Sequence, residues 1–292
     1  MSNIFQQLIN GLSLGSIYAL MALGYTMVYG IIKLINFAHG EVYMIGAFLG
    51  YYFIQVHHLP FILALVLAMV ISAFLGAVIE FLAYRPLRNS SRIAVLITAI
   101  GVSFLLQNVM IYFFGSNPRA FPQALTKKVF EFHGVQISSY QIVIIVTTVV
   151  LMLLLQFIVQ KTKMGKAMRA VSVDADAARL MGINVDLTIS FTFAIGSALA
   201  AAGGVLIGLY YNTINPMMGV TPGLKAFIAA VLGGIGIIPG AVIGGFSIGI
   251  LETIVSALGF SLFKDAFVYA ILILILLVKP SGLLGKNVKE KV

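Results

Sequence analysis

Long, uninterrupted apolar runs constrain the fold of this chain more than any other feature of its sequence. Seven such runs lie at residues 4–28, 61–84, 93–114, 140–159, 187–211, 227–258 and 266–278. An α-helix needs about 20 apolar residues to cross the hydrocarbon core of a bilayer. Continuous runs also favour helices, because the strands of a membrane barrel alternate apolar and polar residues. The sequence therefore predicts an all-α integral membrane protein, a polytopic helical bundle in a lipid bilayer.

The composition excludes a water-soluble protein. Of the 292 residues, 61% are hydrophobic and only 9% are charged, which leaves too few polar groups to cover a soluble globule. The chain has no cysteine, so disulfides, thiolate metal sites and cysteine nucleophiles are excluded. The first apolar run lacks a basic segment before it and is long enough to stay in the bilayer, so we expect no cleavable signal peptide.

Two segments predict broken or re-entrant helices. The run at 227–258 is long enough for two short helices, and the helix-stopping turn Gly236–Gly240, which contains Pro239, divides it. The segment 40–56 is either a further span or a re-entrant one. We therefore expect about eight or nine transmembrane helices, with broken or re-entrant segments among them.

Basic residues gather in three segments, which predict the cytoplasmic side. These 12 of the 18 basic residues are Arg85, Arg88, Arg92, Lys161, Lys163, Lys166, Arg169, Arg179, Lys279, Lys286, Lys289 and Lys291. Lysine and arginine concentrate in cytoplasmic loops beside membrane spans, which explains the net charge of +9 without a nucleic-acid partner. The segment 115–139 then falls outside, and four spans follow the 161–186 loop if the Pro239 turn faces the cytoplasm. The side of the N-terminus stays open.

The loop at 161–186 predicts a short amphipathic surface helix. Met168, Val171, Ala175 and Ala178 recur at helical spacing. Asp174 is a candidate N-cap, Asp176 in the first turn complements the helix dipole, and Gly182 suits a left-handed stop. Two interpretations remain open at this point: a docking surface for a partner, or a helix lying on lipid headgroups.

The segment that follows the first span carries polar residues close to membrane depth. Asn36, His39 and Glu41 are candidates for a solute pathway, because ionisable residues inside a membrane usually face a protein interior or a watery path. The alternative is that they cap and pin a helix end. We expect no metal site, because the chain has four histidines and no cluster reaches three ligands.

Two isolated acids lie within apolar runs. Glu80 precedes Arg85 and is expected to pair with it, whereas Glu252 has small and hydroxyl neighbours such as Thr253 and Ser256. Either acid is a candidate proton site for an ion-coupled transporter. Residues 11–15 and 245–249 show a weak internal sequence similarity, and each segment has two glycines four positions apart.

The motifs of catalysis are missing. The segment 282–287 lacks the spacing and the hydroxyl of a phosphate-binding loop, and no nucleophile elbow, metalloprotease helix or catalytic carboxylate pair is present. We therefore expect a protein that is not an enzyme and that binds no cofactor.

Several motifs, taken together, resemble one known family over nearly the whole length. They are the runs at residues 24–30, 35–43, 84–88, 164–184, 229–236 and 279–285, of which Asn-Phe-Ala-His-Gly-Glu and Ala-Ala-Val-Leu-Gly-Gly-Ile-Gly are the most specific. The chain resembles the LivH-type permeases of bacterial branched-chain amino-acid ABC importers. That resemblance implies one transmembrane permease domain over 1–292, in the bacterial cytoplasmic membrane, with a cytoplasmic coupling loop at 161–186.

The resemblance also implies partners and a fuel. It implies a second related permease, two cytoplasmic ATPase subunits that use ATP, and an extracytoplasmic protein that delivers leucine, isoleucine or valine. The residues that it assigns to ATPase coupling are Asp174, Asp176, Ala177, Ala178, Arg179, Met181 and Gly182. The loop departs from the broad pattern because Asp176 stands where Glu is common and no Pro follows Gly182 at the expected distance.

Other functions remain as alternatives. Related permeases carry other amino acids, short amides or urea. An ion-coupled secondary transporter would use Glu252 and broken helices, a passive channel would also suit glycine-rich broken segments, and a scaffold subunit would carry no solute.

Overall fold

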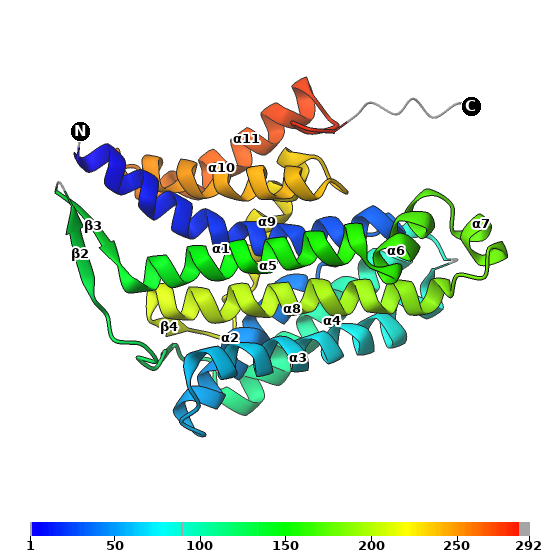
Figure 1. Cartoon of the computed structure of the whole chain (residues 1–292), viewed down its shortest axis with the longest axis horizontal. Helices are drawn as coiled ribbons and strands as arrows, with labels where there is room; N and C mark the ends of the chain where they lie inside the picture. The colour runs from blue at the N-terminus through cyan, green and yellow to red at the C-terminus, as the bar shows by residue number, and fades with distance from the viewer. Residues whose placement is uncertain (1, 89, 133, 286–292) are drawn as a thin grey trace.

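Eleven α-helices form one bundle, and two small β-ribbons lie at one end of it (Figure 1). The computed structural model describes residues 2–88, 90–132 and 134–285. The helices are α1 (Ser2–Ile32), α2 (His39–Gln55), α3 (Phe61–Ile79), α4 (Arg92–Phe114), α5 (Ser139–Lys161), α6 (Lys163–Val173), α7 (Ala175–Leu180), α8 (Val185–Tyr211), α9 (Val220–Gly233), α10 (Ile238–Ala257) and α11 (Lys264–Val278). The strands are β1 (Arg119–Ala120), β2 (Val129–Phe132), β3 (Val135–Ser138) and β4 (Thr213–Ile214), which pair antiparallel as β1 with β4 and β2 with β3.

The predicted all-α polytopic membrane fold is confirmed. Seven helical segments of the described chain are long and apolar enough to cross a membrane. The helices α2 and α9, with 17 and 14 residues, are shorter and pack inside the bundle. Counting these two gives nine membrane helices, within the predicted range of eight or nine.

The two ends of the bundle differ in charge and in structure. The N-terminus and the β2–β3 ribbon lie at one end, and α6, α7 and the end of α11 lie at the other (Figure 1). The basic residues Arg85, Arg88 and Lys161 lie at the α6–α7 end, and the N-terminus lies at the opposite end (Figure 1). Lys286, Lys289 and Lys291 lie outside the described residues.

Helices α1, α8 and α10 form the centre of the bundle. Most of α1 and α8 is buried, whereas α4, α5 and α11 expose apolar side chains along most of their length. The glycine-containing segments that echo each other in the sequence pack directly together, α1 against α10. A Cβ atom added to Gly249 would lie 2.3 Å from the backbone nitrogen of Gly15. Small residues therefore allow these backbones to approach closely, which is how helices associate in lipid.

The predicted break in the run at 227–258 is present and comes slightly earlier than expected. The turn spans 234–237, where Gly234 and Gly236 have φ angles of +104° and +93°, and Pro239 lies in the first turn of α10. Proline suits that position because first-turn N–H groups have no intrahelical acceptor. The segment after α11 packs against the end of α9 just before this turn, since the N–H of Leu283 donates to the carbonyl of Leu232 at 2.8 Å.

Candidate functional site

The loop at 161–186 folds as two short helices that share one residue as a cap. Asp174 ends α6, and its Oδ1 accepts hydrogen bonds from the N–H groups of Asp176 and Ala177, both at 2.9 Å. Gly182 has a φ angle of +81°, and the N–H of Ile183 donates to the carbonyl of Ala178. The N-cap at Asp174 and the left-handed stop at Gly182 are therefore as predicted, in a hairpin of two helices rather than one continuous helix.

The tip of this hairpin projects from the bundle with exposed apolar side chains. Met168 and Val171 of α6 are buried against the bundle, whereas Leu180 and Met181 are 90% and 82% exposed. Asp176 and Arg179 form an exposed ion pair at 3.3 Å beside them. Figure 1 shows α7 as the element farthest from the bundle at this end. Two large apolar residues flanked by charges, on a capped helix, give a compact surface that suits a protein partner.

An ion-pair network holds the bundle together next to this hairpin. Asp186, at the start of α8, is paired with Arg85 and with Arg88, the latter at 2.5 Å. Glu80 is paired with Arg88 and accepts a hydrogen bond from Ser190. The expected pairing of Glu80 with Arg85 is therefore wrong, because Arg85 points to Asp186. Asp186 was missed, since its partners lie about a hundred residues earlier in the chain.

Asn36 and His39 are buried and bonded within the protein. The Oδ1 of Asn36 accepts from the N–H of Ala38 at 3.0 Å and from the hydroxyl of Tyr84 at 2.9 Å. The Nε2 of His39 lies 3.2 Å from the carbonyl oxygen of Met21 in α1. These bonds fix the start of α2 against α1 and α3, so the polar atoms of Asn36 and His39 have internal partners.

Glu41 is different, because one of its carboxylate oxygens faces a cavity. The residue is 2% exposed, and its Oε1 accepts a hydrogen bond from Ser103 of α4 at 3.2 Å. Its Oε2 has no hydrogen-bond partner among the described residues. The cavity has a volume of about 140 Å³ and is lined by residues of four helices: Tyr25, Phe37, Gly40, Glu41, Ile100, Ser103, Gly219, Val220, Gly223 and Leu224.

The N-termini of α2 and α9 meet at this cavity. A Cβ atom added to Gly40 would lie 2.4 Å from the carbonyl oxygen of Gly219, so only glycines allow this approach. Helix N-termini that meet inside a bundle place their positive partial charge where a solute can reach it.

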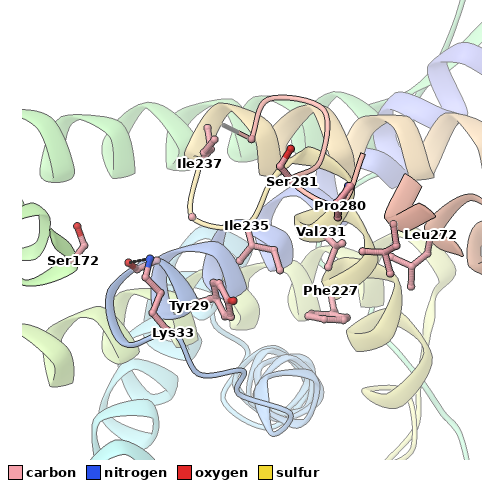
Figure 2. Close-up of a pocket in the computed structure, with 14 residues that line it drawn as sticks. Tyr29, Lys33, Ser172, Phe227, Val231, Ile235, Ile237, Leu272, Pro280 and Ser281 are labelled. Atoms are coloured by element: carbon pink, nitrogen blue, oxygen red, sulfur yellow. Dashed lines mark hydrogen bonds between the residues drawn. The ribbon is translucent and has the colours of Figure 1, made fainter. Parts of the chain in front are cut away.

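A larger cavity, of about 670 Å³, lies toward the α6–α7 end of the bundle and is lined by residues that include Ser172 of α6. Figure 2 shows Tyr29 and Lys33 from the end of α1 facing Phe227 and Val231 of α9 across it, with Leu272 of α11 at its side. Ser172 of α6 reaches its edge. A smaller cavity, of about 90 Å³, is lined by both α6 and the start of α10. The hairpin α6–α7 therefore adjoins the turn between α9 and α10.

A cluster of ion pairs around the buried Lys225 and Glu252 joins α9, α10 and the start of α11. The sequence analysis did not predict this cluster. Lys225 of α9 lies 2.9 Å from Oε1 of Glu252 and 2.7 Å from Asp265. Lys264 lies 2.9 Å from the same Oε1, and the hydroxyl of Tyr18 donates to Oε2 at 2.8 Å. The expectation that Glu252 has only small and hydroxyl neighbours is therefore wrong. Lys225 could have been noticed as a lone charge at the edge of an apolar run.

The fold and the site together define a membrane transport protein: a polytopic bundle with two short helices that meet inside it, and a helical hairpin projecting from one of its ends. Within the described residues, no group of three or more acidic or histidine side chains could hold a metal ion. Residues 7–276 match the family described as the permease component of the branched-chain amino acid transport system. The chain belongs to this family.

Relatives of known name cover nearly the full length. The high-affinity branched-chain amino acid transport system permease protein LivH of Escherichia coli K12 is 47% identical, over 98% of this chain and 97% of the relative. The corresponding permease protein BraD of Pseudomonas aeruginosa is 44% identical over the same shares. A probable LivH of Methanocaldococcus jannaschii is 29% identical, over 94% of this chain and 90% of the relative.

One solved structure has a similar fold. PsaBC from Streptococcus pneumoniae, determined in complex with a Fab, aligns with a TM-score of 0.51 over 93% of this chain and 91% of that chain. The sequence identity is 10%, so the likeness concerns the fold alone.

Proposed function

We propose that this chain is the permease subunit of an ATP-driven importer that carries leucine, isoleucine and valine across the bacterial cytoplasmic membrane. The observation that carries the proposal is the identity of 44% to 47% with permeases of branched-chain amino acid transport systems over nearly the whole length. The complete importer would contain a second homologous permease, two cytoplasmic ATPase subunits and an extracytoplasmic binding protein. ATP would be hydrolysed by the ATPase subunits, and this chain would bind no cofactor.

The α6–α7 hairpin is the proposed contact with one ATPase subunit. In this assignment Leu180 and Met181 enter a groove of the ATPase, and Asp176 and Arg179 fix the orientation. The cap at Asp174 keeps α7 rigid, and a rigid α7 is required if a movement of the ATPase subunit is to be transmitted to the bundle. Because α6 adjoins the turn between α9 and α10, closure of the two ATPases would displace that turn and change the larger cavity.

The proposed solute pathway passes Glu41 and the junction of α2 and α9. Asn36 and His39 would contribute by holding the start of α2 in place, since their polar atoms are bonded to Tyr84 and Met21. The apolar wall beside Glu41 suits an aliphatic side chain, and polar groups at one end suit the charged ends of an amino acid. Other amino acids, short amides and urea are the alternative cargoes.

The geometry of Glu252 disfavours the rival in which this acid is a proton carrier. Two lysines lie within 2.9 Å of one of its oxygens, and Tyr18 donates to the other. A proton that bound to this carboxylate would have to displace one of the three donors that already bind its oxygens. An ion-coupled mechanism would need a different titrating group.

The test is co-purification of the importer from its native membrane in a mild detergent. We expect ATPase subunits with the tagged wild-type chain, and their loss when Asp176 and Arg179 are both replaced by Ala. The matched control is the double replacement Lys128→Ala with Glu131→Ala, which removes one charge of each sign at the outer end. If the Asp176 and Arg179 variant retains its ATPase and its ATP-driven uptake, the docking assignment is wrong.

A further inference from the structure

We propose that Glu41 and the N-termini of α2 and α9 form a subsite for the zwitterionic head group of an aliphatic amino acid. In this subsite the Glu41 carboxylate receives the ammonium group, and the positive N-terminal ends of the α2 and α9 helix dipoles face the carboxylate of the solute. The inference deepens the proposed function and rests on it for the choice of cargo.

The first argument is the free oxygen of Glu41. The side chain is almost completely buried, its Oε1 is bonded to Ser103, and its Oε2 has no partner among the described residues. Buried polar atoms nearly always have hydrogen-bond partners, so an unpartnered buried carboxylate oxygen beside a cavity indicates a missing donor. An ammonium group has three N–H donors and the opposite charge, which makes it the best match for this oxygen.

The second argument is the charge balance around the cavity. Each helix N-terminus is equivalent to about +0.5 elementary charge, so two of them offset about one carboxylate. The ends of α2 and α9 meet here at Gly40 and Gly219, and Glu41 supplies that carboxylate. The cavity is therefore close to neutral overall but separates positive and negative groups. A zwitterion has the same property, whereas a free cation or a free anion does not.

The third argument is the apolar remainder of the cavity. Phe37, Ile100 and Leu224 contribute apolar side chains to its lining. The volume of about 140 Å³ far exceeds the ~15 Å³ that a single water molecule requires. Ile100, Val220 and Leu224 are 38%, 47% and 39% exposed, so the cavity opens between α4 and α9 at the surface of this chain. A solute can therefore enter from that face, where a second permease subunit would pack.

The alternative explanation is that Glu41 only stabilises the N-terminus of α2, in whose first turn it lies. The two explanations differ in what they predict about ammonium recognition. If Glu41 acts only on the helix end, a solute with an ammonium group and the same solute without one should bind alike at this cavity.

The absence of cysteine in this chain allows a direct test in the complete importer, reconstituted in proteoliposomes. Ser103→Cys places a thiol at the cavity, next to Glu41. Its modification on this chain is followed by mass spectrometry, with a methanethiosulfonate reagent that carries an ammonium group and one that carries a sulfonate. Each rate is divided by the rate of the same reagent with free cysteine, which removes the intrinsic difference between the reagents.

We expect the cationic reagent to react about tenfold faster than the anionic one after this correction, because a carboxylate a few ångströms away attracts it. Glu41→Gln in the same Ser103→Cys chain should bring the two rates close together. Leucine should slow the modification of Ser103→Cys at least about threefold, and the analogue of leucine without the amino group should not. Ser116→Cys, in the exposed loop after α4, is the control whose modification leucine leaves unchanged.

The subsite is disproved if leucine gives no protection, or if leucine and its des-amino analogue protect equally. These two results are obtained without Glu41→Gln, so they decide the matter even if that variant does not assemble. Leucine uptake by the wild-type importer is measured in the same proteoliposomes. If leucine uptake is normal but leucine does not protect Ser103→Cys, only the subsite is contradicted. If leucine uptake is absent, the proposed function is contradicted, and the protection of Ser103→Cys then decides whether the subsite exists.

Discussion

The buried ion pair between Lys225 and Glu252 should stabilise the position of α9, and the structure sets the size of the effect. Their side chains are 4% and 3% exposed. Removing one partner of such a pair leaves an uncompensated buried charge, which typically costs about 3–5 kcal/mol of folding free energy. Each residue keeps one further partner here, since Glu252 is also bonded to Lys264 and Lys225 to Asp265. We therefore expect the lower end of that range, about 3 kcal/mol, for Lys225→Met and for Glu252→Gln.

Lys264 provides a matched control within the same cluster. Its ammonium group lies 2.9 Å from the same oxygen of Glu252 as that of Lys225, but its side chain is 35% exposed. Partly solvated ion pairs contribute about 0–1 kcal/mol, because water and salt screen them. Lys264→Met should therefore cost far less than Lys225→Met, although the distances are equal.

The assay is thermal unfolding of the purified chain in detergent, for each single variant and for Lys225→Met combined with Glu252→Gln. About 3 kcal/mol corresponds to a fall in Tm of roughly 6–12 °C for a chain of this size. The double variant should cost about 0.5–3 kcal/mol less than the sum of the single variants, because the two residues interact directly. Equal losses for Lys225→Met and Lys264→Met, or strictly additive losses for the pair, would refute the reasoning.

Two further predictions concern helix packing and the α7 cap. Gly249→Ala should destabilise the bundle by about 1–3 kcal/mol, because the new Cβ would lie 2.3 Å from a backbone atom of Gly15. The control Gly101→Ala, whose Cβ would have no atom within 4 Å, should change the stability by no more than about 0.5 kcal/mol. Thermal unfolding measures both variants, and equal shifts in Tm would contradict the packing of α1 against α10. Asp174→Ala should destabilise α7 locally by about 1 kcal/mol and raise the rate of amide hydrogen exchange at 175–180. The control Asp174→Asn keeps a capping oxygen and should leave that rate unchanged. An unchanged exchange rate in the Ala variant would show that the cap is unimportant.

The spans were predictable because a membrane helix is specified locally. About 20 consecutive apolar residues leave few alternatives in a bilayer, where every backbone group must be bonded within its own segment. The break between α9 and α10 was predictable for the same reason, since glycines and a proline stop a helix wherever they occur. The cap at Asp174 and the stop at Gly182 also depend only on residues within one or two turns.

The ion pairs were not predictable because their partners are far apart in the sequence. Lys225 is 27 residues from Glu252, and Arg85 is 101 residues from Asp186. Lys225 lies just before the apolar run at 227–258, so its position in the sequence suggested that it belongs to an external loop. Only the packing of α9 inside the bundle brings it beside Glu252. The distinct environment of Glu41 was hidden for a similar reason, because Ser103 and the start of α9 reach it from other parts of the chain.

Leucine uptake into proteoliposomes tests the central proposal most directly. The vesicles contain this chain with its partner permease and ATPase subunits, with ATP enclosed on the ATPase side and the binding protein with labelled leucine on the other. We predict uptake that requires ATP hydrolysis and all of these subunits, and that does not change when proton and sodium gradients are removed. Uptake by this chain alone, driven by an ion gradient and independent of ATP, would contradict the account.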